Sequence, residues 1–260
     1  MAELRPRRIT ILTDFGTRDG YVAAMKGVLA GLAPGAGLDD VGHDLAQGDI
    51  HGAMWALGRY WNRYPEGSVH LVVVDPGVGT RRLPMALEAD GRFIVAPDNG
   101  VVSRVLEMAE SWQAVEIAPK DEPVGEEPSA TFHGRDVFAP AAGLLASGVP
   151  LVSLGPPLQA PVEFRSPHPR RERDEAVGEV VSVDRFGNLI TNLPGDWVGE
   201  HSFVEVKGRT LPFVTAYGHG EPGHALALIN SDRLVEVAVR DGSAAEVLDA
   251  GEGTPVHLTG

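Results

Sequence analysis

The sequence predicts two domains, an α/β domain built on a mainly parallel sheet and a small antiparallel β-barrel. Over residues 1–155, apolar strands alternate with segments of helical spacing, and the strand at 71–74 (LVVV) is apolar on both faces, as in a sheet covered on both sides. Over residues 177–260, short strands alternate with Gly, Asn and Asp turns, which favours a barrel. Residues 156–176, rich in proline and arginine, indicate a linker.

Local patterns predict the elements of the first domain. A strand over 8–12 precedes a helix over 19–32, for which Asp19 is a candidate N-cap. A second helix follows Asp49, which we expect to cap it. The remaining expected elements are a strand over 69–75, hairpin strands over 85–88 and 92–96, a helix over 101–108, a strand over 114–117, a surface loop over 120–129 and a helix over 137–146.

Short strands dominate the second domain. They are expected over 178–183, 188–192, 203–206, 211–215, 225–229, 234–239 and 256–258. The whole sequence contains no internal repeat and no low-complexity tract. A small antiparallel barrel therefore follows the α/β domain.

Polar residues follow three apolar strands of the first domain, at the point where each strand ends. These residues are Asp14, Asp75 and Asn99. If the strands are parallel, the three residues meet at one carboxyl edge of the sheet, where open α/β sheets bind ligands. The turn after Asp75 also carries Arg81 and Arg82. We therefore expect a site with a carboxylate and a guanidinium at this edge.

Composition limits the possible partners. The formal charge is −14, which argues against nucleic acid and anionic membranes. The chain has no cysteine, so thiolate chemistry and Cys-ligated zinc are excluded. The first residues carry no apolar signal core and no run reaches the length of a membrane span, so we expect a cytoplasmic protein.

Common catalytic motifs are absent from the sequence. Gly77 and Gly79 lack the third glycine of a dinucleotide fingerprint, because Arg82 stands in its place. Neither a phosphate loop nor a Gly-x-Ser-x-Gly elbow occurs. The remaining set of Asp, Arg, His and Asn can orient and activate a water molecule. His133, between a loop and a predicted helix, is the candidate histidine.

Six segments resemble one known family, in the family's order. They are TDFGTRDGYV (13–22), VVDPGVGTRR (73–82), APDNG (96–100), TFHGRD (131–136), VDRFGNLITN (183–192) and INSDRLVEVAV (229–239). These segments resemble the S-adenosyl-L-methionine (SAM) hydrolases, also called SAM hydroxide adenosyltransferases, which are relatives of the fluorinase and chlorinase. The resemblance extends over about residues 8–258.

The resemblance implies a fold, an assembly and a reaction. It implies a three-layer α/β/α domain followed by a β-barrel, in a homotrimer whose sites lie at subunit interfaces. The implied reaction converts SAM and water into adenosine and methionine, with no metal and no cofactor. Water attacks the ribose C5′ and displaces the neutral thioether of methionine. The family's catalytic Asp, Arg and His correspond to Asp75, Arg82 and His133.

Substrate-binding roles follow from the same resemblance. Asp14 would hold the ribose hydroxyls, a task that suits a carboxylate, and Asp19 would meet the methionine ammonium group. The implied contacts from the second domain are Phe186 and Asn188 with the adenine, in the loop after Asp184, Ser231 with the methionine end, and the strand segment from Glu236 to Val239 with the adenine. Asp232 and Arg233, after Ser231, depart from the family's usual residues.

Three positions differ from the halogenases. Asp75 stands where they carry a tyrosine, Gly134 where the fluorinase carries a serine, and Gly48 where they carry a large aromatic residue. A carboxylate beside the line of attack repels a halide, strongly so in a pocket of low dielectric. The resemblance therefore favours water as the nucleophile.

Two other functions stay open at this stage. A metal-dependent phosphohydrolase could use Asp14, Asp49, His51, Asp75 and His133. A non-catalytic SAM or adenosine sensor would keep Asp14 and Asn188 but would need neither Arg82 nor His133. Within the hydrolase interpretation, Asp75 and His133 are both candidates to accept the proton of the water.

Overall fold

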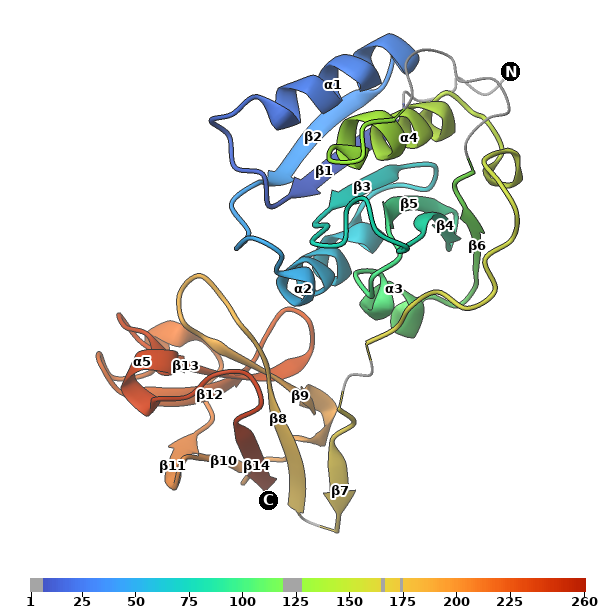
Figure 1. The fold of residues 1–260 in the computed structure, drawn as a ribbon. Helices are drawn as coiled ribbons and strands as arrows, with labels where there is room; N and C mark the ends of the chain where they lie inside the picture. Colours follow the sequence, from blue (N-terminus) through green and yellow to red (C-terminus); the bar gives the residue numbers. More distant parts are fainter. Residues whose placement is uncertain (1–6, 119–127, 165–166, 174) are drawn as a thin grey trace. The chain divides into compact units, whose positions relative to one another are not determined.

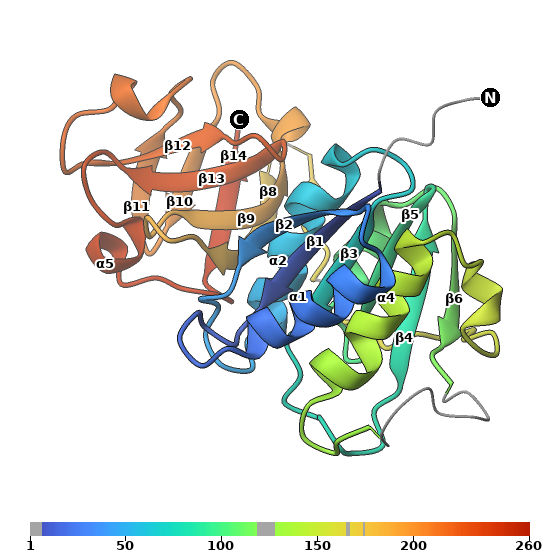
Figure 2. The same ribbon diagram turned by 90° about the horizontal axis from the view of Figure 1, so that it is seen from above.

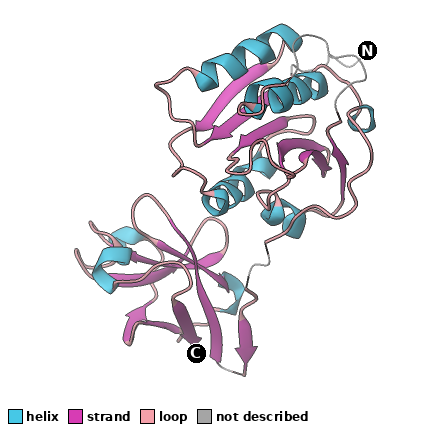
Figure 3. Ribbon diagram, in the orientation of Figure 1, coloured by secondary structure: helices cyan, strands magenta, loops and turns pink. Residues whose placement is uncertain are grey.

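The computed structural model describes residues 7–118, 128–164, 167–173 and 175–260. The chain forms two compact units, Met1–Phe164 and Arg165–Gly260, which we describe separately. Helices and strands alternate in the first unit, whereas strands dominate the second (Figures 1 and 3).

A six-stranded sheet forms the centre of the first unit, in the order β2-β1-β3-β5-β4-β6. Its strands are β1 (Arg8–Thr13), β2 (Gly37–Gly42), β3 (Val69–Val73), β4 (Pro84–Ala89), β5 (Arg92–Pro97) and β6 (Trp112–Glu116). The first four strands in the sheet order are parallel to one another, and β4 runs antiparallel to both β5 and β6. The sheet is therefore mainly parallel, as predicted.

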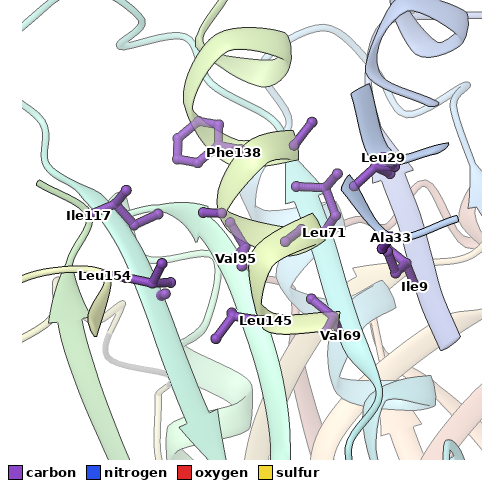
Figure 4. Packing of buried hydrophobic residues seen from close by; sticks show 14 of the residues in the cluster. Ile9, Leu29, Ala33, Val69, Leu71, Val95, Ile117, Phe138, Leu145 and Leu154 are labelled. Carbon is purple, nitrogen blue, oxygen red and sulfur yellow. The ribbon is translucent and has the colours of Figure 1, made fainter. Parts of the chain in front are cut away.

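Helices cover both faces of this sheet (Figures 1 and 2). One face carries α1 (Tyr21–Leu32) and α4 (Ala139–Ala146), and the other carries α2 (Ile50–Tyr60) and α3 (Ser103–Met108). Figure 4 shows the first apolar layer, where Leu29 and Phe138 pack toward Leu71 and Val95 of the sheet. Burial on both faces explains the continuous apolar strands and gives the expected three layers.

The second unit is a nearly closed antiparallel barrel, with strand order β11-β10-β14-β8-β9-β13-β12 and β7 paired to β8. Its strands are β7 (Arg170–Glu172), β8 (Glu175–Val183), β9 (Leu189–Pro194), β10 (Phe203–Val206), β11 (Arg209–Pro212), β12 (Ala225–Ile229), β13 (Leu234–Val239) and β14 (Pro255–Thr259). The chain after β11 meets β12 through a hydrogen bond of 2.9 Å from Val214 N to Ala227 O. Alternate residues fill the interior, among them Val180, Leu189 and Val237.

Short helices complete the two units. They are η1 (Trp61–Arg63), the π-helix η2 (Gly134–Phe138), η3 (Leu151–Ser153), η4 (Gly195–Trp197), η5 (Tyr217–His219) and α5 (Ala244–Leu248).

The structure corrects several local expectations. Asp19 does not cap α1, because Gly20, with φ of 80°, occupies the N-cap position. Asp49 does cap α2, as predicted, and its side chain accepts the Gly52 N–H at 2.7 Å. The helix expected over 137–146 already begins at Gly134, as η2. The strand expected over 211–215 is Arg209–Pro212, and β7 lies within the predicted linker. Most of the predicted loop 120–129 lies outside the described residues.

A buried histidine lies on the α2 side of the sheet. Thr10 of β1 and His70 of β3 are opposite each other in the register, with 2.8 Å between Thr10 Oγ1 and His70 Nδ1. The rings of Tyr60 and Tyr64 lie 5.3 and 5.5 Å from the imidazole ring. Burial lowers the pKa of His70 from 6.5 to about 4, so the ring is neutral at neutral pH.

We expect acid to destabilise the fold through His70. The unfolded chain binds this proton near the ordinary pKa of 6.5 and the folded chain only near about 4. Stability therefore falls as the pH drops through this window, by on the order of 3 kcal/mol. Urea unfolding at several pH values should show that His70→Gln removes this part of the pH dependence.

The matched control is His224→Gln, at a histidine whose side chain is 73% exposed. It should keep the wild-type pH profile. A stability difference between wild type and His70→Gln that stays constant from neutral pH to about pH 4 would contradict the prediction.

Candidate functional site

Three strand ends meet at the carboxyl edge of the first sheet. Strands β1, β3 and β5 are adjacent and parallel, so Asp14, Asp75 and Asn99 follow neighbouring strands, as predicted. The Asn99 side chain joins two of these ends by donating from Nδ2 to Val74 O at 2.9 Å. Its Oδ1 accepts the Val101 N–H at 3.3 Å. The backbone just before Asp75 is thereby fixed to the end of β5.

Asp75, Arg82 and His133 form one hydrogen-bonded array at this edge. Arg82 donates to both carboxylate oxygens of Asp75, from Nε to Oδ1 at 2.8 Å and from Nη2 to Oδ2. The same Nη2 donates to His133 Nδ1 at 3.0 Å. The array joins residues that are 51 positions apart in the chain. The structure therefore brings together the three residues that the resemblance predicted to be catalytic.

Burial makes this ion pair a strong constraint. The Arg82 and Asp75 side chains are only 9% and 5% exposed, and the guanidinium lies 5.0 Å from the ring centre of Phe138. Two parallel N–H···O bonds are the strongest arrangement available to this pair. Arg82 Nη1 is buried without a hydrogen-bond partner among the described residues, and such buried donors are few in folded proteins.

The array also defines the tautomer and the charge of His133. A guanidinium has no acceptor, so His133 Nδ1 must accept and the neutral ring carries its hydrogen on Nε2. Burial lowers the pKa of His133 below its ordinary value, and the charge of Arg82 lowers it further, against smaller opposing effects of Asp75 and Asp136. The histidine is therefore neutral at neutral pH.

The turn after Asp75 returns Arg82 to the carboxylate. The Thr80 hydroxyl donates to Gly77 O at 2.7 Å and tightens the turn. Gly79 has φ of 74°, and a Cβ there would lie 2.5 Å from the carbonyl oxygen of Ala130. Only glycine fits this position. The neighbouring Arg81 is exposed and takes no part in the array.

Packing also leaves little room for a side chain at Gly134, which follows His133. A Cβ at this position would lie 3.2 Å from the rings of both Phe132 and Phe15 and 3.3 Å from Met25 Sδ. The two rings contact each other edge to face, with centroids 5.9 Å apart. A serine here, as the resemblance gives for the fluorinase, would require these side chains to shift by a few tenths of an ångström.

Asp14 and Asp19 differ in their surroundings. Asp14 is half-buried, and its Oδ2 accepts the Gly48 N–H at 2.7 Å. Gly48 has φ of 73°, and a Cβ there would lie 3.6 Å from Pro76, so this contact lies beside the turn that follows Asp75. Asp19 lies in the exposed loop before α1. Asp14 is thus hydrogen-bonded to a glycine that lies beside the turn after Asp75.

Asp184 organises the predicted adenine loop of the second unit. Its Oδ1 accepts the backbone N–H groups of Phe186 and Asn188, both at 2.9 Å. Its Oδ2 accepts from Asn188 Nδ2, also at 2.9 Å. Asn188 is buried, whereas the Phe186 ring is 75% exposed. The loop therefore presents an aromatic ring to solvent on a rigid turn.

The other predicted contacts of the second unit lie on or beside β13. Glu236 and Val239 are buried, and Ser231 is exposed in the turn between β12 and β13. Glu236 Oε1 accepts a hydrogen bond from the hydroxyl of Tyr217 at 2.7 Å. Burial raises the pKa of Tyr217, and this hydrogen bond raises it further. Sequence reasoning missed Tyr217, whose only signal was an aromatic residue in a glycine-rich loop.

The residues of the metal-dependent alternative have other contacts. Among the described residues, no three His, Cys, Asp or Glu side chains form a group that could hold a metal ion. Asp49 is the helix cap, and the His51 ring lies 6.4 Å from the Phe164 ring.

In the described part of the chain, no helix is long and apolar enough to cross a membrane.

The fold and the array define a class of protein, a two-domain α/β and β-barrel protein with a buried Asp–Arg–His site. Residues 9–155 match the SAM hydroxide adenosyltransferase N-terminal domain, and residues 178–257 match the C-terminal domain of the same name. The chain therefore belongs to the SAM hydroxide adenosyltransferase family, which confirms the predicted resemblance.

Individual relatives agree with this membership. The chain is 44% identical to the (R)-S-adenosyl-L-methionine hydrolase of Thermus thermophilus, over 97% of this chain and 99% of that protein. It is 30% identical to a fluorinase of an Actinoplanes species, over 71% of each. The crystal structure of an uncharacterized conserved protein from Thermotoga maritima has a TM-score of 0.89 and 34% identity, covering 97% of this chain and 100% of that one.

We expect His133 to titrate below the ordinary histidine pKa of 6.5. Burial and the charge of Arg82 both oppose protonation, so the ring should stay neutral until the pH falls below that value. NMR titration of histidine-labelled protein measures the midpoint, and His133→Asn assigns the signal. Arg82→Gln should raise the midpoint because it removes a positive charge. A wild-type midpoint above 6.5 would contradict the assignment of Nδ1 as acceptor.

Proposed function

We propose that this protein hydrolyses SAM to adenosine and L-methionine, by attack of water on the ribose C5′. The buried array of Asp75, Arg82 and His133 carries the proposal. Four relatives that are 31% to 44% identical over nearly the full chain are named (R)-S-adenosyl-L-methionine hydrolase, which supports the substrate and the reaction.

The reaction demands little acid–base chemistry. A bond forms between the water oxygen and C5′ while the C5′–S bond breaks. The electron pair of that bond goes to sulfur, which changes from a sulfonium cation to the neutral thioether of methionine. A neutral leaving group needs no proton, so the site has only to orient the water and accept its proton.

The hydrogen-bond directions assign a role to each member of the array. Asp75 is the one anion, and its oxygens keep lone pairs that can accept a hydrogen bond from water. Arg82 holds this carboxylate, and His133 offers its Nε2 hydrogen as a donor. We therefore propose Asp75, rather than His133, as the acceptor of the water's proton.

Substrate-binding roles are proposed for residues of both units. Asp14 binds the ribose hydroxyls and Asp19 the ammonium group of methionine. The proposed contacts from the second unit are Phe186 and Asn188, held by Asp184, together with Glu236 and Val239 at the adenine and Ser231 at the methionine end. The exposed Phe186 ring supports an adenine-stacking role.

Labelled water tests the reaction. EDTA-treated protein is incubated with SAM in water enriched in oxygen-18, and the nucleoside is analysed by mass spectrometry. We expect adenosine labelled at its 5′ oxygen, at an undiminished rate, because the proposed reaction needs neither metal nor cofactor. The Asp75→Asn variant should lose activity by at least about 100-fold, as expected for a lost proton acceptor.

Two neighbouring arginines provide the matched control. Arg82→Gln should also abolish turnover, whereas Arg81→Gln, at the exposed neighbour, should not. Each sulfur epimer of SAM is supplied separately, since the names of the relatives specify the R form; we expect that form to react. SAM that binds but stays intact would favour the sensor alternative, and loss of activity in EDTA would favour the metal-dependent one.

The proposed assembly is a homotrimer acting in the cytoplasm, with sites where the first domain of one chain meets the second domain of its neighbour. The exposed aromatic rings of Phe186 and Tyr217 support an interface at the second unit. Light scattering on the purified protein should give three times the mass of one chain. A monomeric mass with full activity would contradict a site at a subunit interface. Fractionation of the host cell tests the proposed cytoplasmic location.

A further inference from the structure

A second hydrogen-bond chain supports the loop that carries Asp14. Thr13, the last residue of β1, is fully buried, and its Oγ1 lies 2.9 Å from His43 Nδ1. His43 is 7% exposed, and its Nε2 lies 3.0 Å from Asp40 Oδ1. Lys26 donates to the other Asp40 oxygen at 2.6 Å. This chain of hydrogen bonds therefore runs from the surface of β2 to Thr13, the residue before Asp14.

His43 contacts the Asp14 loop at two points. Its side chain holds Thr13, on one side of Asp14, and its backbone oxygen accepts the Gly16 N–H at 2.7 Å, on the other side. The Phe15 N–H donates to Thr13 Oγ1 at 3.3 Å. The two residues between these contacts, Asp14 and Phe15, are thus fixed at both ends by one histidine.

One hydrogen of this hydrogen-bond network is fixed by its acceptor. Asp40 can only accept, so His43 Nε2 carries a hydrogen and donates it. The other ring nitrogen, Nδ1, pairs with the Thr13 hydroxyl, and Thr13 Oγ1 also accepts the Phe15 N–H. The side-chain polar atoms of Thr13 and His43 therefore all have hydrogen-bond partners, which favours a single backbone conformation.

We propose that Thr13 and His43 are positioning residues, which hold Asp14 in the conformation that binds the ribose hydroxyls. This inference rests on the proposed function. Thr13 is fully buried and meets no substrate, so it acts only through Asp14. Gly48 holds one oxygen of Asp14, and the Thr13–His43 pair fixes the backbone from which that carboxylate extends. Binding of the ribose should therefore depend on a hydroxyl that the ribose never contacts.

Thr13→Val tests the proposal because valine has nearly the same shape without the hydroxyl. We expect KM for SAM and Kd for adenosine to rise about tenfold, the size of one lost hydrogen bond of this kind, with kcat much less affected. Thr13→Ser, which restores the hydroxyl, should recover most of the affinity. Calorimetry with adenosine measures binding without turnover.

Thr10→Val is the matched control. Thr10 is buried on the same strand and makes the same kind of contact, to His70 at 2.8 Å, away from the Asp14 loop. It should lower stability as Thr13→Val does and leave KM and Kd unchanged. Equal effects of both variants on affinity, or an unchanged affinity in Thr13→Val, would overturn the positioning role. Wild-type protein that binds adenosine but never cleaves SAM would refute the proposed reaction and leave the positioning role testable by calorimetry.

Discussion

The buried ion pair between Asp75 and Arg82 is the interaction on which the site depends. Two charges removed from water cost several kcal/mol each, and this cost is offset only when the geometry is good. Here both carboxylate oxygens receive N–H groups and the guanidinium lies over the Phe138 ring. Loss of one partner would leave the other charge buried and unpaired, at a cost of about 3–5 kcal/mol. The pair therefore fixes the turn between its members and the tautomer of His133.

The parallel sheet explains why such a pair can form at this place. Helices on both faces bury β1, β3 and β5, and the polar side chains inside these strands, Thr10 and His70, bond to each other, so the polar groups left to form a site lie where the strands end. Asp14, Asp75 and Asn99 occupy these ends, and tight packing supports them. Gly79 has no room for a side chain, and Gly134 has little. The packing that stabilises the sheet thus also sets the geometry of the site.

Local signals predicted the part of this structure that depends on local sequence. Apolar runs followed by Asp or Asn located β1, β3 and β5, and the resemblance supplied the array. Strand β2 was missed because its sequence, GLDDVG, neither alternates nor is fully buried. Asp19 was a wrong cap because a left-handed Gly20 starts the helix. His43 and Tyr217 form hydrogen bonds with partners distant in the chain, Thr13 and Glu236, and no local pattern predicts such contacts.

Hydrogen-bonding capacity supports water as the nucleophile of the proposed reaction. The array contains one anion, one cation and one neutral ring, so its net charge is zero, but the atoms that can still accept a hydrogen bond belong to Asp75. In the proposed reaction, water donates to that carboxylate while its lone pair faces the ribose carbon, whereas a halide has no hydrogen to donate. Because a hydrogen bond is stronger in a low-dielectric environment, the 5% exposure of Asp75 strengthens this preference for a hydrogen-bond donor such as water.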